Sequence, residues 1–173
     1  MTKRRTRTRS GPVLRALAVF LATYGALMTI LFFWGADSIE RYTNVWTAKT
    51  AAWALWLLGE NGRAHADVVE SSLPTIRILS ECTVLYPLVI FASAVVASPT
   101  TWRHKMTAVL GVPLLAIVNL LRIVSLCYIG RWFPGAMDMS HFVIWESLMV
   151  FFTVLLWLLW AARSDSFHDP SSA

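Results

Sequence analysis

The chain has 173 residues, of which 57% are hydrophobic and only 14% are charged. A soluble domain of ordinary composition carries about 25% charged residues, so the composition argues against one. The net charge of +5 does not indicate a nucleic-acid partner, because six of the fifteen Lys and Arg lie in the first fifteen residues, where positive charge sets membrane topology. The apolar runs lack the period-two alternation of a membrane barrel. We therefore expect an all-α integral membrane protein.

Residues 1–12 are basic and polar, and they predict a cytoplasmic tail. The apolar run that follows is too long for the core of a signal peptide and has no small-residue cleavage site near its end, so it predicts a retained first span. Residues 163–173 predict a second cytoplasmic tail, and residues 13–162 a single multi-spanning domain. The four predicted spans are 13–34, 82–97, 106–129 and 141–162.

The long polar region 35–81 has four Lys or Arg against six Asp or Glu, a balance that favours the external side. Within it, residues 45–58 are apolar and contain three Trp. Fourteen residues cover about 21 Å as a helix, too short for a comfortable span. They predict a helix that lies in the membrane interface and ends at Gly59 and Gly62. Residues 74–79 predict a short extended segment.

The basic residues near the other predicted spans test this topology. With the N-terminus inside, four spans place Arg103, Lys105 and Arg163 on the cytoplasmic side, as the positive-inside rule requires. A fifth span at 45–58 would put all three outside. The arrangement of about four spans and one interfacial helix is therefore favoured.

Under this topology, three residues of reactive types lie at a similar depth, near the outer surface of the membrane. Ser80 and Glu81 suit the first turn of the second span, so Cys82 begins that span at the outer surface, and Pro87 predicts a kink one turn in. His141 begins the last span at the same surface. Arg122 lies seven residues before residue 129, within reach of the outer interface.

Each of these residues also has a structural interpretation. A charge at membrane depth is costly, so Arg122 is expected to have a partner, and Glu146 and Asn119 are the candidates. Cys127 is most simply a small apolar filler, and so is Cys82 taken alone. His141 and Glu146 are five residues apart, about 140° round an α-helix, so they are not expected to share a face.

The chemistry that would use all three is nucleophilic acyl transfer. Cys82 would attack as the thiolate, and His141 would take the thiol proton and return it to the leaving amine. Arg122 would stabilise an oxyanion or orient the thiolate. The His and Cys lack the spacing of metal ligands, and no cofactor is expected.

These residues resemble the exosortase/archaeosortase family of multi-spanning membrane cysteine transpeptidases. The matching features are Cys82 at the start of a span, Asn119-Leu-Leu-Arg122 in the next, and His141 at the start of the last. The order Cys, Arg, His is that of the family's proposed catalytic triad. The surroundings of Cys82, Pro87 and Glu146 look most like the exosortase H type, associated with substrates that carry an IPTLxxWG motif.

The resemblance implies a protein-sorting enzyme in a bacterial inner membrane, with its active site at the extracytoplasmic face. Its partners would be secreted proteins with a C-terminal sorting signal made of a motif, a transmembrane helix and a basic tail. Cys82 would cleave near the motif through a thioacyl intermediate. Transfer to an unknown acceptor amine, or hydrolysis, would follow.

Two other functions remain open from the sequence. A thiol redox membrane protein would use Cys82 and Cys127 as a pair in an oxidising compartment. A noncatalytic membrane scaffold subunit would use Arg122 and Glu146 only as a structural ion pair.

Overall fold

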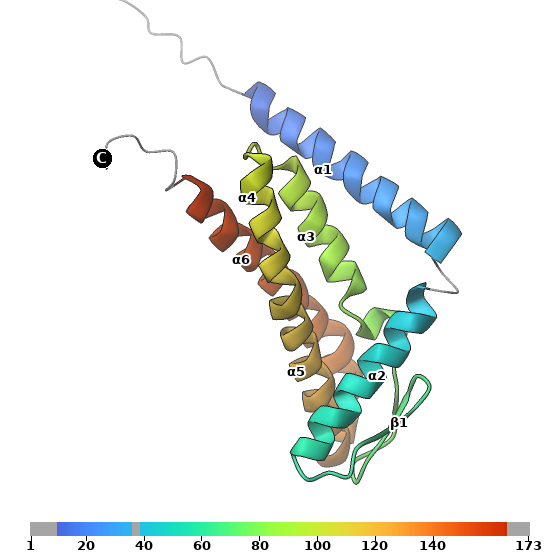
Figure 1. Ribbon diagram of the computed structural model, residues 1–173. Coiled ribbons are helices and arrows are strands. Elements are labelled where there is room, and N and C mark those ends of the chain that lie inside the picture. The colour runs from blue at the N-terminus through green and yellow to red at the C-terminus, as the bar shows by residue number, and fades with distance from the viewer. Residues whose placement is uncertain (1–9, 36–38, 166–173) are drawn as a thin grey trace, which may run out of the picture.

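A computed structural model describes residues 10–35 and 39–165 of the chain. It is 80% helical, and three of its helical stretches are long and apolar enough to cross a membrane. These are Gly11–Phe33, Trp102–Trp132 and Met139–Arg163. The helices α1 (Ser10–Ile30), α3 (Leu85–Ala97), α4 (Trp102–Thr107), α5 (Gly111–Trp132) and α6 (Glu146–Asp165) run along the length of the molecule, and α2 (Ile39–Leu57) crosses one end of it (Figure 1).

The boundaries of the first and last helices differ from the predicted ones. The α1 helix starts at Ser10 and continues as a π-helical segment, Leu31–Gly35, so the predicted tail 1–12 includes the first turn of this helix. Likewise α6 continues to Asp165, past the predicted limit at residue 162. The remaining parts of the two predicted tails, 1–9 and 166–173, lie outside the described residues.

The second predicted span is shorter than expected. The α3 helix has 13 residues, about 20 Å, and it begins at Leu85. Cys82 therefore does not lie in its first turn but in a separate 3-10 turn, Ser80–Cys82. Pro87 is the third residue of α3, where a backbone N–H has no helical partner to lose, so it fits in the first turn and does not kink the helix. The predicted kink is wrong for this reason.

The third predicted span is longer than expected. α4, a 3-10 turn Ala108–Leu110 and α5 follow one another directly as one apolar helical stretch of 31 residues. The gap between the second and third predicted spans, residues 98 to 105, is therefore reduced to the few residues before Trp102. Gly111 sits where this stretch meets α3 and α6, because a Cβ there would approach the Phe91 ring to 2.7 Å and Leu156 to 3.0 Å.

The external region 35–81 folds into a helix and a small sheet. α2 is longer than the predicted 45–58, and it ends at Gly59 in a Schellman motif, with φ of +85° and a hydrogen bond from Glu60 N–H to the Leu55 carbonyl. Gly62 lies against this helix, since a Cβ there would overlap the carbonyl oxygen of Ala52. The prediction that glycines end the helix is confirmed.

The two faces of α2 differ. Ala48, Ala51, Ala52 and Leu55 are buried, whereas Trp46, Trp53 and Trp56 are more than half exposed. The small residues allow close contact with the sheet and α5, and the tryptophans form the outer face. An apolar outer face rich in Trp suits the predicted position in the membrane interface.

The sheet has the order β1-β2-β3 and is antiparallel throughout. Its strands are β1 (Arg63–His65), β2 (Val68–Glu70) and β3 (Ile76–Arg77). The third strand confirms the extended segment predicted at 74–79. The first two strands were not predicted, because three residues are too few to show alternation in a sequence. The sheet lies beside α2, at the same end of the molecule (Figure 1).

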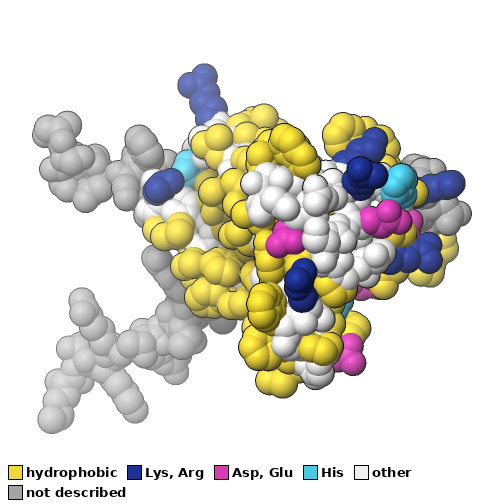
Figure 2. Space-filling view, turned by 90° about the horizontal axis from the view of Figure 1, so that it is seen from below, with side chains coloured by type: hydrophobic (Ala, Val, Ile, Leu, Met, Phe, Trp, Pro, Cys, Tyr) yellow, Lys and Arg dark blue, Asp and Glu magenta, His cyan; other side chains and the backbone are white. Residues whose placement is uncertain are grey.

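The two ends of the molecule differ in composition. At one end, the start of α1 lies near the α3–α4 connection, since Val13 and Pro99 line a common groove, and His104 Nε2 lies 3.3 Å from the carbonyl oxygen of Trp160 in α6. The basic residues Arg103 and Lys105 are therefore at the end opposite to the sheet. Figure 2, seen from the sheet's side, shows acidic and basic side chains surrounded by hydrophobic ones.

Candidate functional site

Cys82 is held in its turn by residues from two other parts of the chain and by bonds within the turn. Its backbone N–H donates to Leu79, and its carbonyl oxygen accepts a hydrogen bond from Asn119 Nδ2 at 2.9 Å. The preceding Ser80 hydroxyl donates to Glu40 Oε2 of α2 at 2.7 Å. The Thr83 hydroxyl closes the turn by donating to the Ser80 carbonyl. Cys82 is thus fixed by α2 and α5, although it belongs to neither helix.

The thiol of Cys82 lies 3.2 Å from Nε2 of His141, so the two atoms are within hydrogen-bond distance for sulfur. The residues are 59 positions apart in the chain. With the imidazole neutral and its proton on Nδ1, the thiol donates to Nε2. This arrangement allows a proton to pass directly from sulfur to the ring nitrogen.

Arg122 is buried in α5, with 2% of its side chain exposed, and its NH2 group lies 3.2 Å from Glu146 Oε2. The pairing with Glu146 that the sequence left open is therefore present. Arg122 Nε is buried and has no hydrogen-bond partner within 10–35 and 39–165. The guanidinium thus has a counter-charge and also retains an unused donor.

Asn119 lies one turn before Arg122 on α5 and is 3% exposed. Its amide faces the Cys82 carbonyl through Nδ2, and the reverse orientation would set two acceptors against each other. Its Oδ1 is buried and unpaired within the described part of the chain. Asn119 therefore hydrogen-bonds to the cysteine turn, and within the described residues no hydrogen bond joins it to Arg122, which was the other structural possibility.

A π-helical segment explains how His141 and Glu146 both reach this site. Residues Met139–Trp145 form a π-helix before α6 begins at Glu146. The hydrogen bonds of a π-helix run from i to i+5, so residues five apart lie one above the other. The expectation that His141 and Glu146 point to different faces assumed an α-helix, and it is wrong. Nothing in the sequence indicates the π-helix.

A cavity of about 210 Å³ lies beside the thiol. Its lining comes from the β3 segment, from Cys82, from α5 and from the segment that leads into α6. The side chains of Leu79 and Phe142 are 52% and 67% exposed, so they form an apolar rim. The lining residues are Ile76, Arg77, Ile78, Leu79, Cys82, Ile123, Leu126, Met137, Asp138, His141 and Phe142.

The acidity of Cys82, which lies outside the membrane-spanning helices, reflects opposing effects. Burial raises the pKa of the thiol, the hydrogen bond from the backbone at Leu79 and the positive charge of Arg122 lower it, and Glu81 and Glu146 raise it again. The pKa remains above the ordinary value. The resting group is therefore a neutral thiol, and it needs a base such as His141 to become a nucleophile.

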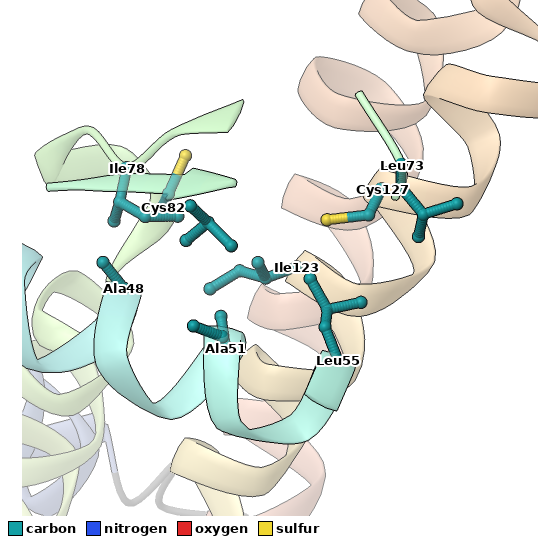
Figure 3. Packing of buried hydrophobic residues seen from close by; sticks show 10 residues of the cluster. Ala48, Ala51, Leu55, Leu73, Ile78, Cys82, Ile123 and Cys127 are labelled. Atoms are coloured by element: carbon teal, nitrogen blue, oxygen red, sulfur yellow. The ribbon is translucent and has the colours of Figure 1, made fainter. Parts of the chain in front are cut away.

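Cys127 belongs to the same buried cluster as Cys82, but within the described residues its thiol makes no hydrogen bond to His141. Figure 3 shows this cluster, in which Ala48, Ala51 and Leu55 of α2 pack near Ile123 of α5. Both cysteines are free thiols. Cys127 is 1% exposed, which fits its predicted role as an apolar filler.

Some contacts at the site could not be predicted from the sequence. Glu40, which anchors Ser80, lies in a region predicted to be outside the membrane, and no motif marks it. Asp138 lines the cavity, and no sequence motif marks it either. Across residues 10–35 and 39–165, no group of three or more His, Cys, Asp or Glu side chains is placed to hold a metal ion.

Comparisons with protein-family models, with curated proteins and with solved structures give no match to this chain.

Proposed function

We propose that this protein is a membrane cysteine peptidase or transpeptidase of the exosortase type. The observation that carries the proposal is the 3.2 Å contact between Cys82 Sγ and His141 Nε2 beside a cavity. A thiol within hydrogen-bond distance of an imidazole is the minimal arrangement for nucleophilic acyl transfer. The Cys, Arg, His order and the Asn119-to-Arg122 element, which resemble the exosortase H type, add support from the sequence.

In the proposed reaction, His141 Nε2 takes the Cys82 proton and the thiolate attacks the scissile carbonyl carbon. The C–N bond then breaks, and the imidazolium of His141 gives its proton to the leaving amine. The acyl group remains on Cys82 as a thioester. An acceptor amine or water next attacks the thioester, His141 takes its proton, and the departing Cys82 thiolate is reprotonated.

Arg122 has the role of stabilising the oxyanion in this scheme. Its buried position and its free Nε donor support that role, because a fixed cation in a low-dielectric site acts strongly on a developing negative charge. Glu146 Oε2 accepts a hydrogen bond from NH2 of the guanidinium and so holds it in place. Asn119 positions the nucleophile through the Cys82 carbonyl and does not touch the reacting atoms.

The substrates are secreted proteins with a C-terminal motif, a transmembrane helix and a basic tail, and the acceptor is an amine of unknown identity. The protein resides in a bacterial inner membrane, with four spans and the site at the extracytoplasmic face. The separation of the site from the basic Arg103–Lys105 end supports this orientation.

Co-expression with a reporter tests the proposal. The reporter is a secreted domain followed by an IPTLxxWG motif, an apolar helix and a basic tail. We expect Cys82→Ala, Arg122→Ala and His141→Ala each to abolish processing while the protein still accumulates in the membrane. Cys127→Ala, which removes the other buried thiol, is the matched control and should process normally.

Full processing by Cys82→Ala would falsify the proposed function. The thiol redox alternative has its own test in alkylation of the active protein under nonreducing conditions. A dominant Cys82–Cys127 disulfide there would contradict a transpeptidase. If all variants process alike and only accumulation changes, the scaffold alternative holds.

A further inference from the structure

β3 is an edge strand whose outer side carries free backbone groups. The sheet order β1-β2-β3 leaves one side of β3 without a neighbouring strand. Ile78 N–H donates to the Asp67 carbonyl at 2.7 Å, and Val69 pairs with Ile76, so residues 76 and 78 direct their backbone groups toward β2. Backbone groups alternate in direction along a strand, so those of Arg77 and Leu79 are directed away from β2.

Arg77 supplies the outward donor and acceptor that another strand needs. Arg77 lies opposite Val68 in a non-hydrogen-bonded pair, so neither its N–H nor its C=O bonds to a residue in 10–35 or 39–165. The Leu79 carbonyl, in contrast, accepts from the Cys82 N–H, and the Leu79 backbone also bonds to the Cys82 thiol. The N–H and C=O of one outward residue are the donor and acceptor of one hydrogen-bonded pair in an antiparallel ladder. An unpaired strand edge of this kind readily accepts an extended peptide.

The cavity beside the thiol runs along this edge. Four consecutive residues, Ile76 to Leu79, line it together with Cys82 and His141. The segment with Met137, Asp138 and Phe142 contributes further lining from a distant part of the chain. A peptide that paired with β3 would therefore lie in the cavity, next to the sulfur.

Resting on the proposed function, we propose that the substrate polypeptide binds as a fourth strand of this sheet, paired through its backbone with Arg77, which presents its scissile bond to Cys82. The main chain supplies the binding, so the ligand is an extended peptide segment and not a helix. Leu79 and Phe142 at the rim receive apolar side chains of that segment. Recognition by backbone pairing tolerates varied sequence, while the rim selects alternate side chains.

One substitution tests the pairing without dismantling the sheet. Proline at an edge strand is tolerated where the lost N–H faces away from the neighbouring strand, and the N–H of Arg77 does so. Arg77→Pro removes the outward donor and blocks the edge. The matched control, Arg77→Ala, keeps the donor and removes only the side chain with its exposed ion pair to Asp67, which is worth little.

We expect Arg77→Pro to slow processing of the reporter by about tenfold or more, the effect of losing roughly 1.4 kcal/mol of binding in the transition state. Arg77→Ala keeps the outward donor, so it should process the reporter severalfold faster than Arg77→Pro. The two variants should have equal thermal midpoints and equal rates of Cys82 alkylation by iodoacetamide, which shows that the fold and thiol are intact. Ile78→Pro, which loses the inward bond to Asp67, should lower the midpoint.

Equal processing by Arg77→Pro and Arg77→Ala would overturn the inference and leave the proposed function standing. A second measurement does not depend on catalysis: a photo-cross-linking residue at position 79 in the Cys82→Ala variant should capture the reporter, whereas one at the exposed Trp102 should not. If the unaltered protein processes no reporter, the proposed function fails. The cross-link at position 79 then decides the inference alone, and its absence overturns it.

Discussion

Arg122 of α5 and Glu146 of α6 form an ion pair of unequal burial. The Arg122 side chain is 2% exposed and the Glu146 side chain 56%, with 3.2 Å between NH2 and Oε2. A buried cation that loses its only counter-charge is destabilising, whereas an exposed carboxylate that loses a partner remains solvated. The stability of the pair therefore depends on keeping an acceptor at position 146.

Glu146→Ala should lower the free energy of unfolding by about 1–3 kcal/mol, because it leaves the Arg122 guanidinium buried without its acceptor. Glu146→Gln keeps an oxygen acceptor and should lose less. Thermal unfolding of the purified proteins in detergent measures both changes. Equal midpoints for Glu146→Ala and the unaltered protein would contradict a stabilising role for the pair.

The pH dependence of Cys82 alkylation should depend on Arg122. The pKa of the Cys82 thiol is above its ordinary value through burial, and Arg122 opposes that rise. Arg122→Gln should therefore move the midpoint of alkylation to higher pH, and below the midpoint each further unit of pKa slows the reaction about tenfold. Arg122→Lys keeps the charge and serves as the control.

These rates are measured with iodoacetamide on a Cys127→Ala background, so that a single thiol reacts. A midpoint that stays in place in Arg122→Gln would show that the guanidinium does not act on the sulfur. A midpoint below the ordinary cysteine value in the unaltered protein would contradict a neutral resting thiol.

Asn119 should affect the position of Cys82 more than the stability of the protein. Asn119→Asp has the same shape but replaces the donor with acceptors, so it loses the bond to the Cys82 carbonyl, worth about 1 kcal/mol. We expect slower reporter processing with normal accumulation. Asn119→Leu also loses the hydrogen bond, but it places no carboxylate against the Cys82 carbonyl oxygen. Processing by Asn119→Leu should therefore fall less than processing by Asn119→Asp.

Gly62 should be sensitive to a single added methyl group. Gly62→Ala places a Cβ against the Ala52 carbonyl and within 2.9 Å of Leu55, so the chain must shift away from α2. Overpacking of this kind costs about 1–3 kcal/mol. Gly25→Ala, where a Cβ meets nothing within 4 Å, is the control and should leave the thermal midpoint unchanged or raise it. Equal midpoints for the two variants would contradict the close packing of α2.

Hydropathy and charge alone predicted most of the helical framework. The runs that became Gly11–Phe33, Trp102–Trp132 and Met139–Arg163 are apolar over more than twenty residues, and burial in lipid leaves helices as the only way to satisfy their backbone. The Trp-rich helix and its end at Gly59 also followed from local chemistry, because a glycine with positive φ suits a helix C-terminus. The observed helix boundaries differ from the predicted ones because the end of a helix depends on its packing against neighbouring segments as well as on composition.

The sequence by itself determined which residues carry reactive groups, namely Cys82, Arg122 and His141, and that an intramembrane cation needs a partner. Tertiary structure decided their contacts. A turn held by Asn119, and not a helix start, presents Cys82, and a π-helix puts His141 and Glu146 on one face. Neither feature produces a periodic pattern in the sequence, because each depends on hydrogen bonds and packing between segments far apart in the chain. Those long-range contacts bring the thiol within 3.2 Å of the imidazole.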